Sequence, residues 1–101
     1  MKKEELFSVL EYEITIIDFW AEWCAPCRII SPILDQLEKE NENVSLIKLN
    51  VEDEENKVLI SEFDIKSIPA ILIVNKEGVV LHRFSGNRPK GAIQELLNSV
   101  L

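Results

Sequence analysis

The fold is decided between residues 14 and 27, which read ITIIDFWAEWCAPC. Residues 14–20 are too apolar on both faces for a half-exposed strand, which indicates a central strand of a sheet that is covered on both sides. The only two cysteines of the chain, Cys24 and Cys27, follow where a helical pattern begins. Two thiols with two residues between them, at a strand-to-helix junction, are typical of a dithiol that cycles with a disulfide.

The start of a helix favours a reactive thiol. Its first turn presents unpaired N–H groups and the positive end of the helix dipole, and both stabilise a thiolate. The thiolate is the nucleophile in disulfide exchange, and Cys24 lies just ahead of the predicted helix. Pro26 suits this position because a missing N–H costs nothing in the first turn. We therefore expect Cys24 to be the attacking thiol and Cys27 the resolving thiol.

A metal site is the main alternative for a cysteine pair. A closed structural zinc site needs four ligands, whereas this chain offers two thiols and one histidine, His82, on a predicted strand. One chain alone therefore cannot build the usual zinc site. Two chains that share a metal ion or an iron–sulfur cluster are an alternative that the spacing leaves open. We expect no metal and no bound cofactor.

Composition narrows the class of protein. The net charge is −7 and no cluster of lysine and arginine exists, which argues against a nucleic-acid partner. No apolar run approaches the ~18 residues of a membrane span, and Met1-Lys2-Lys3 is not followed by the apolar stretch of a signal peptide. We expect one domain, residues 1–101, working in the cytoplasm, where a dithiol is catalytic more often than structural.

The remaining patterns predict the element order α-β-α-β-α-β-β-α. Helices are expected at 3–11, 24–41, 58–63 and from 89 onward, and strands at 14–20, 44–51, 70–74 and 79–84. Such an order predicts an α/β fold with a mixed sheet of about four strands and helices on both faces. Pro32 should kink the second helix, and Gly78 should provide a positive φ in the turn of the last hairpin. The apolar stripes of the helices include Val9, Ile29 and Val58.

Asp18 is the anomaly in the central strand. A carboxylate in a buried strand is costly unless it is paired or protonated. It is either an acid at the strand end that reaches water, or a buried proton acceptor near the dithiol. Burial would raise its pKa toward neutrality, where a general base works best. Lys48 is a candidate partner if its strand is a neighbour, and otherwise a surface lysine.

At this point the residues match a known family. Residues 18–27, DFWAEWCAPC, resemble the active-site stretch of the thioredoxin family. Counterparts of family features also recur at residues 31–34, 48–52 and 68–69 and at the two turns with Gly78 and Gly86. The resemblance covers essentially the whole chain and implies the thioredoxin fold.

The resemblance implies a role for each of these residues. Cys24 would form a mixed disulfide with a substrate, and Cys27 would resolve it. Asp18 would lie beneath Cys27 and serve proton transfer, with Lys48 close by. Pro69 would be cis and face the dithiol. The substrate groove would be lined by Trp23, Ala25, Pro26, Ile68, Pro69 and Gly86.

The family also implies partners. These are protein disulfide substrates and a separate electron donor of the thioredoxin-reductase type, with the Cys24–Cys27 disulfide as the only redox group and a monomeric chain. Ala25 stands where the family usually has glycine, so the direction of electron flow stays open. A disulfide isomerase or oxidant of the same fold is therefore one alternative. A non-catalytic binding module is another.

A second departure concerns the sheet. Family members usually carry a strand before the first helix, whereas here 23 residues precede Cys24 and the first of them look helical. We therefore expect no strand before residue 12, and a four-stranded sheet in which the strand 44–51 is an exposed edge.

Overall fold

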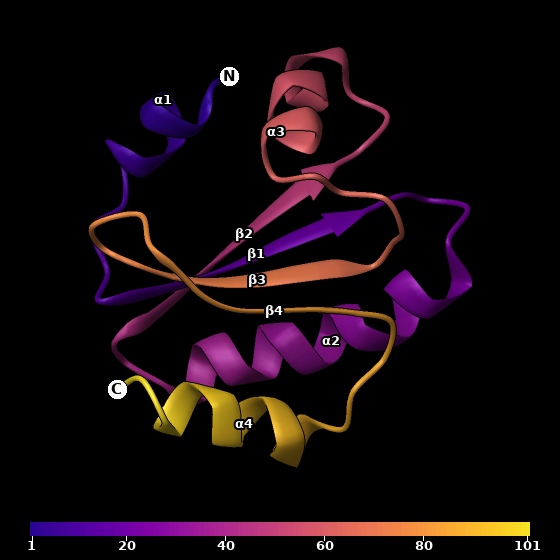
Figure 1. The fold of residues 1–101 in the computed structure, drawn as a ribbon. Coiled ribbons are helices and arrows are strands. Elements are labelled where there is room, and N and C mark those ends of the chain that lie inside the picture. Colours follow the sequence, from indigo (N-terminus) through magenta and orange to yellow (C-terminus); the bar gives the residue numbers. More distant parts are fainter.

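A computed structural model describes all residues 1–101, and its centre is a four-stranded mixed sheet (Figure 1). The strands are β1 (Ile14–Trp20), β2 (Val44–Asn50), β3 (Ala70–Asn75) and β4 (Val80–Ser85), in the spatial order β2-β1-β3-β4. β1 pairs with β2 in parallel and with β3 antiparallel, and β3 and β4 form an antiparallel hairpin. The expected sheet, with β2 at one edge and no strand before residue 12, is confirmed.

Helices cover both faces of this sheet. They are α1 (Lys3–Phe7), α2 (Ala25–Glu40), α3 (Lys57–Glu62), which follows a short 3-10 turn at Glu54–Asn56, and α4 (Lys90–Asn98). Figure 1 shows α2 and α4 together on one side of the sheet and α1 and α3 on the other. The predicted order of elements is confirmed, and α2 continues through Pro32. α1 ends at Phe7, earlier than expected, and the Ser8 hydroxyl donates to the Glu5 carbonyl at its end.

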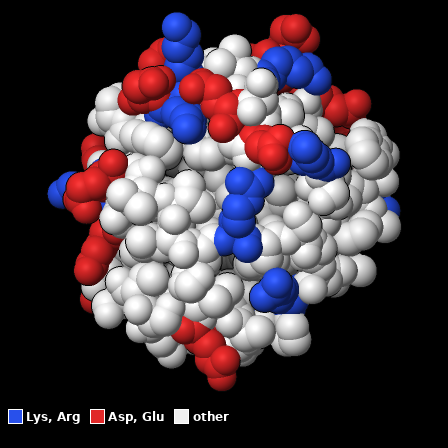
Figure 2. Space-filling model, viewed as in Figure 1, with Lys and Arg blue, Asp and Glu red and all other residues white.

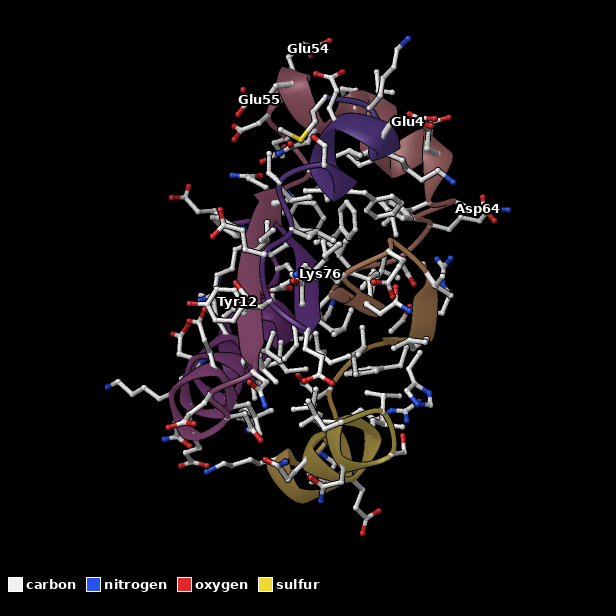
Figure 3. All side chains as sticks on the ribbon, turned by 90° about the vertical axis from the view of Figure 1, so that its left-hand side faces the viewer. Glu4, Tyr12, Glu54, Glu55, Asp64 and Lys76 are labelled. Carbon is white, nitrogen blue, oxygen red and sulfur yellow. A yellow bond between two sulfur atoms is a disulfide. The ribbon has the colours of Figure 1, made fainter.

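Each face of the sheet has its own apolar core, because successive strand residues point to opposite sides. The α2/α4 face buries Ile14, Ile16, Ile30, Leu34, Leu37, Val44, Ile71, Ile73, Phe84, Ile93 and Leu97. The α1/α3 face buries Leu6, Leu10, Ile17, Phe19, Leu59, Phe63, Ala70, Leu72 and Val74. Figure 3 shows side chains filling both layers, whereas Glu54 and Glu55 project outward. The central position predicted for β1 is confirmed.

Three apolar side chains of the predicted stripes are exposed instead. Val9 is 60% exposed, Ile29 59% and Val58 44%. Val9 lies beyond the end of α1, which removes it from the helical stripe. Ile29 and Val58 each precede the residue that does point into a core, Ile30 or Leu59. Including these three residues in the buried stripes was therefore wrong.

The hairpin turn between β3 and β4 packs against α1. Gly78 has φ +86°, as predicted for this turn, and its backbone lies directly against the ring of Phe7. The Asn75 Oδ1 atom accepts the N–H groups of Glu77 and Val79 at 3.1 and 2.9 Å. Phe7 in turn meets Phe63 edge-on, with 5.9 Å between ring centroids. The turn and α1 therefore hold one another in place.

The outer edge of β2 is capped by two side chains. The Glu38 carboxylate accepts the Leu46 N–H at 2.9 Å, and the Asn56 amide donates to the Asn50 carbonyl at 2.9 Å. These groups occupy backbone sites that an additional strand would otherwise use.

Candidate active site

The two cysteines lie where β1 passes into α2. Cys24 is the residue that caps the N-terminus of α2, and Cys27 lies in its first turn. They form a disulfide with their Cα atoms 5.3 Å apart, and both side chains are buried. The Cys27 N–H donates to the Cys24 sulfur at 3.2 Å. In the reduced protein this donor would stabilise a thiolate at Cys24, as would the positive end of α2.

The loop before β3 faces the disulfide. The Ile68–Pro69 peptide bond is cis, as the resemblance implied. The Ile68 side chain packs against the buried cluster of Ala21, Cys24 and Cys27. The N–H of Gly86, which has φ +79°, donates to the Pro69 carbonyl at 3.0 Å. Ile68 therefore lies against the cysteines, and Gly86 is bound to Pro69, the next residue along the chain.

The surface beside the disulfide is largely apolar. Trp23 is 66% exposed, and Ala25 and Pro26 are exposed next to it along the chain. Trp23 and Ile68 share a hollow of about 310 Å³ whose other lining residues are Val51, Lys57, Ile60, Ile65, Lys66 and Ser67. The β1–α2 connection lies at the right of Figure 1, and Figure 2 shows few charged side chains on that side. This surface could hold an extended peptide by apolar contact.

Asp18 is buried on the face of β1 that α2 and α4 cover. It lies one alternation beyond Ile14 and Ile16, and is 1% exposed. Neither of its carboxylate oxygens has a hydrogen-bond partner. Burial raises the pKa of Asp18 to about 6, while the charge of Lys48 lowers it and that of Asp35 raises it. An acid that reaches water at the strand end is therefore excluded.

Lys48 lies directly beside Asp18 in the parallel register of β1 and β2. Its ammonium nevertheless pairs with Asp35 Oδ1 at 2.9 Å and donates to Ser31 Oγ at 2.7 Å. No ion pair joins it to Asp18, so Lys48 acts on its neighbour Asp18 through its charge and not through a direct contact. The Lys48 side chain is 31% exposed, and binding the exposed Asp35 spares the cost of burying two charges.

A pocket of about 250 Å³ opens at this point of the molecule. Trp20, Cys27, Arg28, Ser31 and Lys48 line it. Sequence reasoning missed Ser31 and Asp35. Their spacing could have identified them, because Cys27, Ser31 and Asp35 recur every four residues and so lie on one side of α2.

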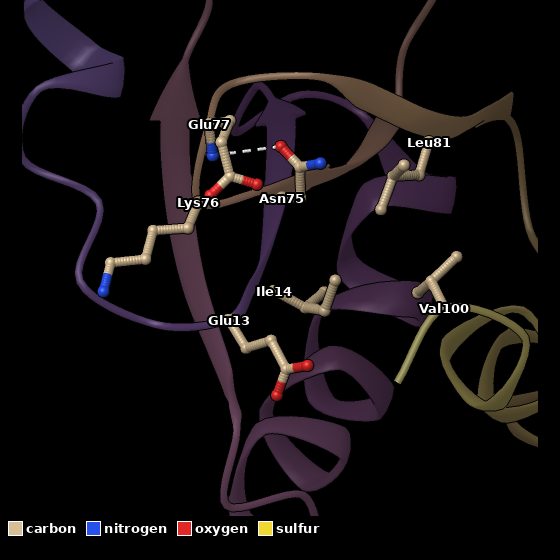
Figure 4. A pocket seen from close by; sticks show the side chains of 7 residues that line it. All are labelled: Glu13, Ile14, Asn75, Lys76, Glu77, Leu81 and Val100. Carbon is tan, nitrogen blue, oxygen red and sulfur yellow. Dashed lines mark hydrogen bonds between the residues drawn. The ribbon is translucent and has the colours of Figure 1, made fainter.

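A larger hollow lies at the opposite end of the sheet. It has a volume of about 530 Å³ and is lined by Glu13, Ile14, Asn75, Lys76, Glu77, Leu81 and Val100. Figure 4 shows the Lys76 side chain extending away from Leu81 and Val100. None of its lining side chains has a buried polar atom without a partner, so nothing there points to a ligand.

Two further features concern metals and membranes. No three His, Cys, Asp or Glu side chains gather as a metal site would require, and His82 Nε2 bonds the Ser99 hydroxyl at 3.1 Å instead. None of the helices combines the length and apolar character that crossing a membrane requires.

A disulfide of the Cys-X-X-Cys type at a helix N-terminus, on a mixed sheet, defines a thiol–disulfide oxidoreductase. The family model described as Thioredoxin matches residues 2–99. The chain belongs to the thioredoxin family and is a protein-disulfide reductase of that type.

Relatives of known name agree with this membership. The chain is 37% identical over 89 residues to a thioredoxin of Bacillus subtilis, covering 87% of this chain and 83% of the relative. It is 38% identical over 98 residues to a thioredoxin of Rickettsia felis, covering 96% and 88%. Among solved structures, a mutant thioredoxin from Halobacterium salinarum superimposes with a TM-score of 0.84 at 24% identity, covering 96% of this chain and 83% of that one. That likeness shows the thioredoxin fold.

Proposed function

We propose that residues 1–101 act as one domain that reduces protein disulfides through a mixed disulfide on Cys24. The Cys24 thiolate attacks one sulfur of the substrate disulfide. A bond forms between Cys24 and that sulfur, the substrate S–S bond breaks, and the departing thiolate takes a proton from water.

Cys27 completes the reaction. Its thiol gives a proton to the Asp18 carboxylate, and the resulting thiolate attacks the Cys24 sulfur. The Cys24–Cys27 disulfide forms, and the second substrate sulfur leaves as a thiolate and is protonated. The substrate has then gained two electrons and two protons, and a donor of the thioredoxin-reductase type returns them to the protein.

The single observation that carries this proposal is a buried carboxylate without a hydrogen-bond partner, on the strand that leads into the Cys24–Cys27 disulfide. A pKa of about 6 leaves Asp18 mostly ionised at neutral pH and still able to accept a proton. Lys48 supports the ionised form through its positive charge. Substrate would bind as an extended segment against Trp23, Ala25, Pro26, Ile68, Pro69 and Gly86. We place this activity in the cytoplasm.

Reduction of insulin by the purified protein, coupled to dithiothreitol or to NADPH and a thioredoxin reductase, tests the proposal. Cys24→Ser should abolish the reaction, whereas Cys27→Ser should accumulate a mixed disulfide that mass spectrometry detects. Unchanged insulin reduction by Cys24→Ser would refute the assignment of the attacking thiol.

The redox potential distinguishes the alternative that Ala25 leaves open. We expect a potential of about −270 mV, the value typical of thioredoxins. A potential of about −180 mV or above would instead indicate an isomerase or oxidant.

A further inference from the structure

Lys48 is held by the helix above the sheet rather than by the acid beside it. Asp35 lies two helical turns beyond Cys27, and Ser31 lies between them on the same side of α2. Both bind the Lys48 ammonium, at 2.9 and 2.7 Å. Ser31 and Lys48 also line the 250 Å³ pocket to which Cys27 contributes. Asp35 and Ser31 therefore hold the Lys48 ammonium at the wall of this pocket.

The charges around Asp18 come from two elements only. β2 contributes Lys48, and α2 contributes Asp35 and, at the pocket wall, Arg28. β3 faces Asp18 with the apolar Ile71, and α4 contributes the apolar side chains of Ile93 and Leu97 to this face. The next ion pair, Lys90 with Glu40, joins α4 to the far end of α2. Lys48 and Asp35 therefore dominate the electrostatic field at Asp18.

We propose that Asp35 is a positioning residue for the reaction, which holds Lys48 away from Asp18 and so keeps Asp18 ready to accept a proton from Cys27. This inference rests on the proposed role of Asp18. Asp35 raises the proton affinity of Asp18 in two ways. Its negative charge disfavours a second negative charge at Asp18, and its ion pair with Lys48 keeps the ammonium from moving toward Asp18.

Loss of the Asp35 charge should therefore favour the ionised form of Asp18. In Asp35→Asn we expect the Asp18 titration midpoint to fall by about half a pH unit, roughly a threefold change in proton affinity. Asp35→Glu keeps the charge and should restore most of the original midpoint. In a Lys48→Met background, Asp35→Asn should have a smaller effect, because part of it acts through the lysine.

Carbon-13 NMR of the Asp18 carboxyl in the oxidised protein measures this midpoint without any turnover. The pH dependence of kcat/KM for insulin reduction measures its consequence, and its acidic limb should move to lower pH in Asp35→Asn. Glu40→Gln is the matched control, since it also breaks a lysine–carboxylate pair on α2, with 2.8 Å between the groups, but far from Asp18.

Three outcomes are informative. If both midpoints fall in Asp35→Asn and neither does in Glu40→Gln, the proposal is supported. If the NMR midpoint is unchanged, or if both variants shift it equally, the proposal is overturned. A protein whose Asp18 titration responds to Asp35 but which reduces no disulfide would refute the proposed function instead, and leave the electrostatic link standing.

Discussion

The two faces of the sheet are built from the same strands but differ in what they bury. The α1/α3 face buries apolar side chains together with the uncharged Thr15, and includes the edge-on pairs of Phe63 with Phe7 and Phe19. The α2/α4 face follows the same pattern along Ile14 and Ile16 and then places a carboxylate where the next apolar side chain would be expected. Both faces thus gain stability from apolar burial, and the α2/α4 face gives up part of it at Asp18.

This comparison separates two kinds of burial. Apolar burial stabilises a fold in proportion to the area removed from water, whereas burial of an unpaired carboxylate opposes folding whenever that group is charged. Asp18 has no hydrogen-bond partner and Lys48 pairs elsewhere, so its cost is largely uncompensated. Truncation of a buried apolar side chain and neutralisation of Asp18 should therefore change stability in opposite directions.

The largest effect is expected on the apolar face. Phe19→Ala removes a fully buried aromatic side chain and should lower the free energy of unfolding by about 3–5 kcal/mol. Urea unfolding measures the loss. Because Phe19 points away from Asp18, the midpoint of the Asp18 titration should be unchanged in this variant. A shift of that midpoint would mean that the two faces are coupled. Phe19→Leu leaves a smaller cavity and serves if the alanine variant does not fold.

Asp18→Asn should have the opposite sign. The pKa of Asp18 is about 6 in the folded protein and 3.8 ordinarily, so between these values the folded state binds more protons than the unfolded state. The free energy of unfolding of the parent protein therefore falls as pH rises from about 4 to about 6.

The asparagine variant lacks this dependence. It should be more stable than the parent by up to about 3 kcal/mol at pH 7, with the gain vanishing below pH 4. Urea unfolding at pH 4 and pH 7 measures both values. An equal gain at the two pH values would contradict the assignment of the cost to charge.

Gly78→Ala should have the smallest effect. A side chain at φ +86° costs roughly 1–2 kcal/mol, and the new Cβ would also require the Phe7 ring to move. Thermal unfolding should show this loss while insulin reduction is unchanged. Gly91→Ala is the control, because a Cβ at that position would meet no other atom. Alanine favours the helix, so the free energy of unfolding should rise by up to about 1 kcal/mol. If both variants lost the same stability, the positive φ and the close packing at Gly78 would not explain the loss.

Much of this arrangement was predictable because short patterns determine it. The apolar run of β1 and the cysteines behind it located the redox centre, and the turn at Gly78 predicted the hairpin. The partner of Lys48 was not predictable from strand pairing. Register placed Lys48 beside Asp18 correctly, but the choice of partner depends on the cost of desolvating both charges and on a helix that approaches from above. The early end of α1 was likewise not predictable, since its last residue, Phe7, packs against the distant hairpin turn at Gly78.

The capped edge of β2 has a consequence for how the domain can be enlarged. Asp18 is on the inner strand β1, and Lys48 is on the edge strand β2, where Asp35 and Ser31 of α2 hold its ammonium. A strand supplied from outside would have to displace Glu38 from the Leu46 N–H and Asn56 from the Asn50 carbonyl. It would displace no residue that surrounds the disulfide. The sheet could therefore be widened by fusion or by association at this edge while its chemistry stayed the same.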